Sequence, residues 1–309
     1  MRPVVNHIGV SGGKDSTALL LWAVHESDYD PATLDVTFCD TSNEHEITYD
    51  YVRMLSEKVH PITWLNMRAF MQATGRPDIM GFYELARWKQ RFPGPRSRFC
   101  TDFLKIKPSL YHINALIALL GCDVVMHSGV RASESDERAK MVAREEEREN
   151  VSIFRPLLKW SIDDVWAIHK KYGIEPNPLY AAGAQRVGCL PCIMSRKAEI
   201  ANIATRWPER ITMIGDVEKS KFASRDHPEG KEHGFFKYNT VPKRFRSRKI
   251  TTSDGRTMNV CTIEDVVQWA TEPPKIKPAA EFKNGDLFSD LDTRTEDKTA
   301  CQSTWGSCE

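Results

Sequence analysis

The segment that most constrains this chain is "VVNHIGVSGGKDSTALLLW" near its start. The apolar run 4–10 predicts a strand, and the helix-spaced apolar run 18–24 predicts a helix. Two glycines lie between them, and because glycine lacks a Cβ atom, their amides can approach and turn toward a ligand. The helix N-terminus adds partial positive charge and Lys14 adds a full one. This segment therefore predicts an anion site, with a phosphate group as the obvious ligand.

The spacing of this loop excludes two well-known phosphate loops. A Walker A loop counted from Gly9 places its lysine at Lys14, but that motif needs Ser or Thr next and the chain has Asp15. The dinucleotide pattern Gly-x-Gly-x-x-Gly is absent as well. The remaining motif, Ser-Gly-Gly-Lys-Asp-Ser, resembles the PP-loop of the adenine-nucleotide α-hydrolases. In that group the loop holds the β,γ-pyrophosphate while the chemistry takes place at the α-phosphate.

Composition limits the class of protein. With 309 residues, 41% of them hydrophobic, the chain can bury one large core, or one core and a smaller second domain. The net charge of +1 gives the whole chain no polyanion-binding signature. It contains neither an apolar run of about 20 residues nor a signal-peptide pattern. We therefore expect a cytoplasmic protein that does not enter a membrane, with eight cysteines that are buried, metal-binding or catalytic rather than disulfide-bonded.

Strand-like and helix-like segments alternate through the first two thirds of the chain. This alternation predicts an α/β fold with a doubly wound, mostly parallel sheet. The expected strands after the first are 34–40, 61–65 and 123–129, and the expected helices are 45–59, 109–121, 134–149, 161–173 and 262–270. In such sheets ligands bind at the carboxyl ends of the strands, where Ser11, Asp40 and Gly129 would lie.

The pattern loosens toward the C-terminus, and we predict three parts. Residues 1–208 form the nucleotide-binding α/β domain and include a Cys-x-x-Cys segment. Residues 209–278 form a smaller, irregular region of helices and loops, with prolines typical of a linker near its end. Residues 279–309 form a polar, flexible tail that contains cysteines.

A Cys-x-x-Cys pair, Cys189 and Cys192, suggests a metal or cluster site. Two thiolates at this spacing fit one face of a metal ion or cluster, but a complete zinc site usually has a second pair. Here the nearest partner is the single Cys100. Three thiolates suit a [4Fe–4S] cluster with one open iron, or Zn²⁺ with one open position. Candidates for a fourth ligand are Cys261, Cys301 and Cys308, and an unoccupied reduced pair is the alternative.

Six segments, taken in order, resemble the phosphoadenosine phosphosulfate (PAPS) reductase family of PP-loop proteins over roughly residues 4–210. They are "VSGGKDSTALL", "FCDTSNEHEITYDYV", "RFCTDFLKIKP", "HSGVRASESDERA", "RPLLKWSIDDVW" and "IEPNPLYAAGAQRVGCLPC". The resemblance implies an adenine nucleotide α-hydrolase-like fold and an adenine-nucleotide site. The residues it places around the nucleotide are Ser11, Gly12, Gly13, Lys14, Asp15, Ser16, Asp40, Thr41, Gly129 and Arg131.

Residue chemistry supports part of that assignment and leaves part of it open. The guanidinium of Arg131 follows a strand end and a glycine, so it could hold an oxyanion through two hydrogen bonds or form a salt bridge with Glu134 or Asp136. Asp40 could accept a hydrogen bond from ribose or adenine, help to hold Mg²⁺, or cap a helix. The expected catalytic residues are Lys14, Asp15, Arg131 and Cys308.

Two departures from the reductases of this family decide which activity we expect. The segment that carries adjacent cysteines in adenylyl-sulfate reductases has only Cys100 here, and the tail "CQSTWGSCE" lacks their Glu-Cys-Gly-(Leu/Ile)-His motif. The chain is more similar to relatives that cleave ATP to AMP and pyrophosphate and handle sulfur at a cluster. We therefore expect ATP or an adenylate with Mg²⁺ as substrate, with sulfur transfer at the three cysteines. Alternatives are a sulfonucleotide reductase that uses Cys308, and a nucleotide-sensing or nucleic-acid-binding regulator.

Two basic segments, 86–100 and 241–249, contain interleaved aromatic residues. Such clusters contact a nucleic-acid backbone or a highly charged small substrate, or simply form a solvated surface. The expected partners are thus an adenine nucleotide and either a nucleic acid or a sulfur-donor protein, and an oligomer is compatible with the sequence.

Overall fold

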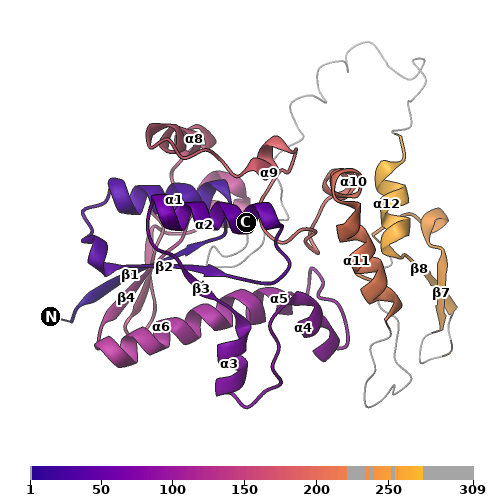
Figure 1. The fold of residues 1–309 in the computed structure, drawn as a ribbon, viewed down its shortest axis with the longest axis horizontal. Coiled ribbons are helices and arrows are strands. Elements are labelled where there is room, and N and C mark those ends of the chain that lie inside the picture. The colour runs from indigo at the N-terminus through magenta and orange to yellow at the C-terminus, as the bar shows by residue number, and fades with distance from the viewer. Residues whose placement is uncertain (1, 221–233, 237–239, 252–254, 256, 274–309) are drawn as a thin grey trace, which may run out of the picture.

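The structure, a computed structural model, describes residues 2–220, 234–236, 240–251, 255 and 257–273. Its centre is a six-stranded sheet in the order β3-β2-β1-β4-β6-β5 (Figure 1). All neighbours are parallel except β5 and β6. The strands are β1 (Val4–Val10), β2 (Leu34–Cys39), β3 (Thr63–Leu65), β4 (Asp123–His127), β5 (Arg144–Arg148) and β6 (Val151–Phe154). The predicted α/β class is confirmed.

Helices cover both faces of this sheet, as Figure 1 shows. On one face, α1 (Lys14–His25), α2 (Glu46–Lys58) and α8 (Ile162–Lys171) pack on the apolar side chains of β1 and β2. On the other face α6 (Lys107–Leu120) packs on β4 and β6. The remaining short α-helices are α3 (Met67–Ala73), α4 (Phe82–Trp88), α5 (Phe99–Thr101), α7 (Asp136–Ala139) and α9 (Pro178–Ala181).

The helix predicted over 134–149 is wrong. Within that range only α7 and Glu134, the last residue of a 3-10 turn, are helical. The charged segment 144–148 forms β5, the antiparallel edge strand paired with β6. Asn150 adopts a left-handed conformation, with φ 61°, in the turn that joins the two strands. Asparagine tolerates this conformation in tight turns, and hydrogen bonding to β6 outweighs the helix propensity of the glutamates.

A C-terminal unit lies beside the sheet domain in Figure 1. It comprises α10 (Lys197–Arg206), α11 (Pro208–Lys219), α12 (Ile263–Thr271) and the antiparallel pair β7 (Arg248–Thr251) and β8 (Thr257–Val260). The boundary predicted between residues 208 and 209 falls in the first turn of α11, after Pro208. Apolar side chains of this unit, including Ile200, Ile214 and Val266, join those of α3, α4 and α5 in one continuous core. The tail predicted over 279–309 lies outside the described residues.

In the part of the chain that the structure describes, no helix combines the length and apolar character needed to cross a bilayer.

Glu218 makes the stability of the C-terminal unit depend on pH. Its carboxylate is 3% exposed and accepts hydrogen bonds from the amides of Phe235 (2.6 Å) and Ile263 (2.8 Å). Burial outweighs these bonds and raises the pKa of Glu218 from 4.5 to about 7. Between these values the folded protein binds the proton more tightly than the unfolded chain. We therefore expect the free energy of unfolding to fall by about 3 kcal/mol as pH rises from 4.5 to above 7.

Denaturant titrations at pH 4.5 and pH 7.5 measure this change. Glu218→Gln should flatten the pH dependence, although it lowers stability overall because one accepting oxygen is lost. An unchanged pH profile in this variant would contradict the assignment.

Candidate functional site

The strand order creates a switch point between β1 and β4. The chain runs outward from β1 through β2 to β3, and then returns to place β4 on the other side of β1. The loops that follow β1 and β4 therefore diverge and leave a crevice at the carboxyl edge of the sheet. Open α/β sheets bind ligands at such a point.

The loop after β1 has the conformation that its two glycines permit. Gly12 adopts a φ of 78°, and a Cβ atom on it would lie 3.0 Å from Cγ2 of Thr48. Ser16 donates its hydroxyl to the carbonyl of Gly13 at 3.0 Å and closes the loop. The N-cap residue of α1 is Gly13, which has no side chain to cap the helix, and the amide of Lys14 donates to the hydroxyl of Tyr180 at 3.0 Å. Helix geometry leaves the amides of Asp15 and Ser16 without a partner inside α1, so they can donate to an anion.

Asp15 connects this loop to the loop after β4. Its fully buried carboxylate lies 2.7 Å from Nζ of Lys14 and accepts a hydrogen bond from Nε of Arg131, also at 2.7 Å. Arg131 further donates to the hydroxyl of Ser133 at 2.9 Å and, through its amide, to Glu134. The three charged residues predicted from the sequence therefore lie together. Asp15 holds the two cations in place, and its negative charge makes it unsuited to contact a phosphate directly.

Gly129 lets the two loops approach each other. A Cβ atom at this position would lie 3.2 Å from the carbonyl oxygen of Asp15 and 3.5 Å from its carbonyl carbon. Gly129→Ala must push the β4 loop away from α1, because a backbone carbonyl cannot rotate aside as a flexible side chain can. We expect a loss of about 1–3 kcal/mol in the free energy of unfolding, together with weaker nucleotide binding.

Chemical denaturation and calorimetry with Mg-ATP measure these two effects. For the loss in the free energy of unfolding, Gly9→Ala is the matched control, because a Cβ atom at that position meets nothing within 4 Å. Equal stability losses in the two variants would show that the close approach at Gly129 is unimportant.

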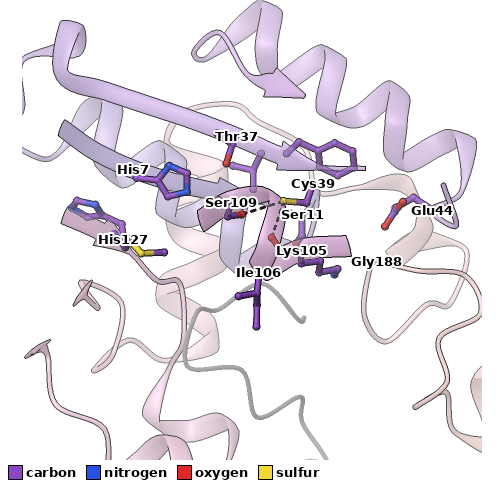
Figure 2. Close-up of a pocket in the computed structure, with 14 residues that line it drawn as sticks. His7, Ser11, Thr37, Cys39, Glu44, Lys105, Ile106, Ser109, His127 and Gly188 are labelled. Atoms are coloured by element: carbon purple, nitrogen blue, oxygen red, sulfur yellow. Dashed lines mark hydrogen bonds between the residues drawn. The ribbon is translucent and has the colours of Figure 1, made fainter. Parts of the chain in front are cut away.

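A pocket, here called the sheet pocket, extends from the β1 loop along the α6 face of the sheet (Figure 2). It is lined by His7, Gly9, Val10, Ser11, Thr37, Phe38, Cys39, Glu44, Lys105, Ile106, Ser109, Met126, His127 and Gly188. The thiol of Cys39 lies 3.2 Å from the hydroxyl of Ser109 and donates to the carbonyl of Lys105 at 3.5 Å. Burial raises the pKa of Cys39, so this thiol stays protonated on the pocket wall.

A second pocket, here called the cysteine pocket, brings together the three predicted metal ligands. It is lined by Thr41, Arg98, Cys100, Thr101, Leu104, Lys105, Arg186, Gly188, Cys189, Cys192, Ile193 and Met194. Burial opposes the positive charge of Arg186, but the neighbouring Cys192 and Glu199 hold the pKa of Arg186 above its ordinary value. This pocket therefore combines sulfur donors with cationic side chains.

The two pockets share part of their walls. Lys105 and Gly188 line both of them. Lys105 lies in a π-helical turn, Asp102–Ile106, that leads into α6, and such turns often occur at functional sites. Burial and the carboxylate of Glu44 raise the pKa of Cys189, whereas the positive charge of Lys105 lowers it.

Glu44 forms a second connection between the pockets. Its side chain lines the sheet pocket, and Oε1 accepts hydrogen bonds from the hydroxyl of Thr41 (2.7 Å) and the thiol of Cys189 (3.7 Å). Thr41 was expected beside the nucleotide, and the structure places it in the wall of the cysteine pocket. Asp40 accepts hydrogen bonds from the amide of Ser42 (2.7 Å) and the hydroxyl of Tyr49 (2.8 Å).

The structure also locates the remaining cysteines. Cys261 was a candidate fourth ligand, but it is buried in the core and donates weakly to the carbonyl of Phe236, 3.9 Å away. It is not among the residues that line the cysteine pocket. Cys301 and Cys308 lie outside the described residues.

The two basic segments predicted from the sequence lie in different places. In the first, 86–100, Arg98 lines the cysteine pocket. In the second, 241–249, Arg244 pairs with Glu272 at 2.6 Å.

Sequence reasoning missed Glu44, Lys105 and Tyr180 as site residues. The Tyr180 hydroxyl accepts a hydrogen bond from the amide of Lys14 at 3.0 Å, across 166 positions of the chain. All three residues lie inside segments that carried the family resemblance, so their position in those segments was the available signal. The local sequence pattern does not show that Tyr180 contacts Lys14, or that Glu44 and Lys105 line one pocket. These contacts join segments that are far apart in the chain.

The crevice at the switch point, the glycine loop at the N-terminus of α1 and its cations define a PP-loop nucleotide-binding protein. Comparison with known families agrees: the model for the phosphoadenosine phosphosulfate reductase domain matches residues 6–195. The chain belongs to this family, and this membership indicates an enzyme.

One relative matches nearly the whole chain, whereas the named reductases match only part of it. A 37.8 kDa uncharacterized protein in the gpa 5' region of Escherichia phage 186 is 33% identical, over 99% of this chain and 97% of its own length. The adenosine 5'-phosphosulfate reductase of Burkholderia cepacia is 31% identical over only 35% of this chain and 41% of that enzyme. A solved phosphoadenylyl-sulfate reductase from Candida auris aligns with a TM-score of 0.43 and 17% identity, covering 62% of this chain and 83% of its own.

Proposed function

We propose that this enzyme binds ATP or a closely related adenylate in the sheet pocket, releases pyrophosphate, and uses the activated product for sulfur transfer at the cysteine pocket. The observation that carries this proposal is the wall that the two pockets share, formed by Lys105 and Gly188. A nucleotide held by the β1 loop extends toward that wall, so its reactive end and the sulfur donors lie close together.

The first step is a displacement at the α-phosphorus. An acceptor oxygen attacks that phosphorus, the bond to the bridging oxygen of the β-phosphate breaks, and pyrophosphate leaves with the electron pair. Lys14 and the first-turn amides of α1 stabilise the charge that develops on pyrophosphate. Asp15 fixes the positions of Lys14 and Arg131, and Mg²⁺ would enter with the phosphates that it binds. In the second step a sulfur nucleophile displaces AMP from the activated acceptor.

We propose an iron–sulfur cluster in the cysteine pocket, because the side chains of Cys100, Cys189 and Cys192 line it together. Three cysteine ligands leave one iron of a [4Fe–4S] cluster open to bind or deliver sulfur. A single zinc ion would keep one open position with the same three ligands. Zn²⁺ remains the second choice.

The test compares products. The anaerobically purified full chain is incubated with Mg-ATP, and pyrophosphate and AMP are measured with and without candidate sulfur acceptors. Stoichiometric or greater pyrophosphate release, together with bound iron and sulfide, supports the proposal. Release of neither product, or formation of ADP and phosphate instead, would overturn it.

A second candidate is the reduction of adenylyl sulfate or its 3'-phosphate to sulfite. It is favoured by the relatives named adenosine 5'-phosphosulfate reductase, although each aligned region covers only part of those enzymes. Sulfite release from adenylyl sulfate with thioredoxin as reductant, without pyrophosphate release from ATP, would select this candidate over the first.

A further inference from the structure

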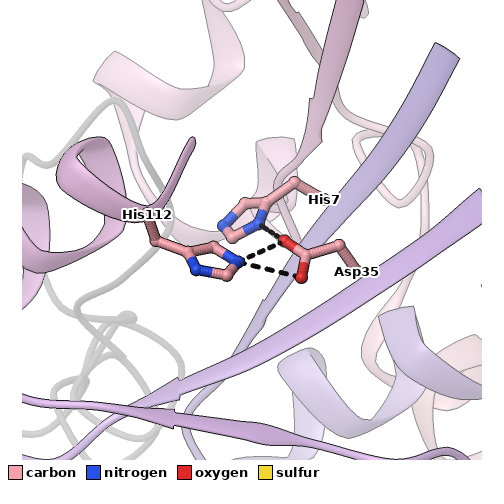
Figure 3. A group of neighbouring side chains, drawn as sticks. All are labelled: His7, Asp35 and His112. Carbon is pink, nitrogen blue, oxygen red and sulfur yellow. Dashed lines mark hydrogen bonds and ion pairs between the residues drawn. The ribbon is translucent and has the colours of Figure 1, made fainter. Parts of the chain in front are cut away.

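A separate group of metal-ligating side chains lies deep on the α6 face of the sheet (Figure 3). Nδ1 of His7 donates to Oδ2 of Asp35 at 2.7 Å. Nε2 of His112 faces both oxygens of the same carboxylate, at 2.9 and 3.0 Å. One ligand atom from each residue lies within 4.8 Å of the others. Figure 3 shows both imidazoles turned toward the carboxylate.

The fold brings these residues together from three elements. His7 on β1 and Asp35 on β2 are direct neighbours in the parallel ladder, so their side chains point to the same face of the sheet. His112 comes from α6, which lies over that face. No short sequence motif joins them, since Asp35 and His112 are 77 positions apart.

From this convergence we infer a second metal site, in which His7, Asp35 and His112 bind a divalent transition-metal ion of the zinc type. Two imidazole nitrogens and one carboxylate oxygen are a frequent donor set for such an ion, which takes each at about 2.0–2.2 Å. One ligand atom from each residue lies within 4.8 Å of the others, close to the spacing of donor atoms around one such ion. The exposed fractions of the His112 and Asp35 side chains, 21% and 16%, leave room for water as a further ligand.

The charge state of the group suits a cation. The carboxylate of Asp35 supplies a negative charge beside two imidazoles, and such a mixed set of nitrogen and oxygen donors binds divalent ions of the zinc type. The alternative is a hydrogen-bonded imidazole–carboxylate network without a metal, and the experiment below separates the two.

A metal here would connect α6 to β1 and β2 beside the sheet pocket. His7 itself lines the sheet pocket, and the first turn of α6 supplies Ser109 to the same pocket. The ion would thus fix the distance between the helix and the sheet at the inner end of the sheet pocket. Its role is in positioning the pocket wall, and it takes no part in the displacement at phosphorus.

The test uses the full-length, metal-stripped protein with Co²⁺ and Zn²⁺ alone. We expect one equivalent of Co²⁺ with visible d–d bands and without the near-ultraviolet charge-transfer band that thiolate ligands give. His112→Ala should remove that equivalent and leave any thiolate-bound cobalt in place. At a hundredfold excess of Zn²⁺ over its Kd, the native Tm should rise by about 4 °C, and the variant should lose this gain.

His60→Ala is the matched control, because the ring of His60 bonds only to the neighbouring carbonyl of Pro61, at 2.9 Å, in the described structure. Asp35→Asn provides a second ligand variant, so that a folding defect in one does not decide the result. Cobalt bound only through thiolates, or an unchanged nitrogen–oxygen spectrum in both variants, would overturn the proposal and leave the hydrogen-bonded network as the explanation.

Discussion

Lys14→Ala is expected to reduce the rate of pyrophosphate release about 100- to 1,000-fold, the range found when one preorganised charge-stabilising group is removed. Lys14 is the cation of the β1 loop, and its amino group is held 2.7 Å from the buried Asp15. Without it, the first-turn amides of α1 and Arg131 remain, so some binding of Mg-ATP should persist. Single-turnover kinetics and calorimetry with Mg-ATP measure the two effects separately.

Lys171→Ala is the matched control for this prediction. Lys171 pairs with Glu26 at 2.7 Å, just beyond the opposite end of α1, and its side chain is 61% exposed. This variant removes one positive charge near the same helix without touching the loop, so turnover should stay within about twofold of native. Equal losses in both variants, or a Lys14→Ala enzyme with native turnover, would contradict the role assigned to the loop.

Cys189→Ser is expected to have the second large effect. Changing residues that only support metal ligands already costs about 10- to 100-fold in metal affinity, so removing a proposed ligand should cost at least as much. Iron and sulfide, or zinc, should fall well below the native content, and sulfur transfer should be lost. The affinity for Mg-ATP should change little, because Cys189 does not line the sheet pocket.

Cys122→Ala controls for the loss of any one thiol. Cys122 is fully buried between β4 and α6 and does not line either pocket. Its variant should keep both metal content and sulfur transfer, with some loss of stability from the smaller side chain. A Cys189→Ser protein that retains its full metal content would remove the cysteine pocket from the proposed function.

Local sequence patterns predicted the parts of the fold that form through short-range interactions. The glycine loop between β1 and α1 follows from the lack of a Cβ atom in Gly12 and Gly13. The start of α8 follows from the reciprocal hydrogen bonds of Ser161 and Asp164. The same reasoning failed at 144–148. The charged residues there have a local preference for a helix, but hydrogen bonding to β6 makes the segment a strand.

Tertiary structure alone decided which residues share a site. The sequence identified Lys14, Asp15 and Arg131 as charged candidates, but only the packing of the β4 loop on α1 shows that Asp15 holds the two cations. Likewise, neither the shared wall at Lys105 nor the convergence of His112 with its partners has a local signature. The physical reason is that backbone propensities and turn chemistry act over a few neighbouring residues, whereas a site depends on contacts between strands and helices far apart in the chain.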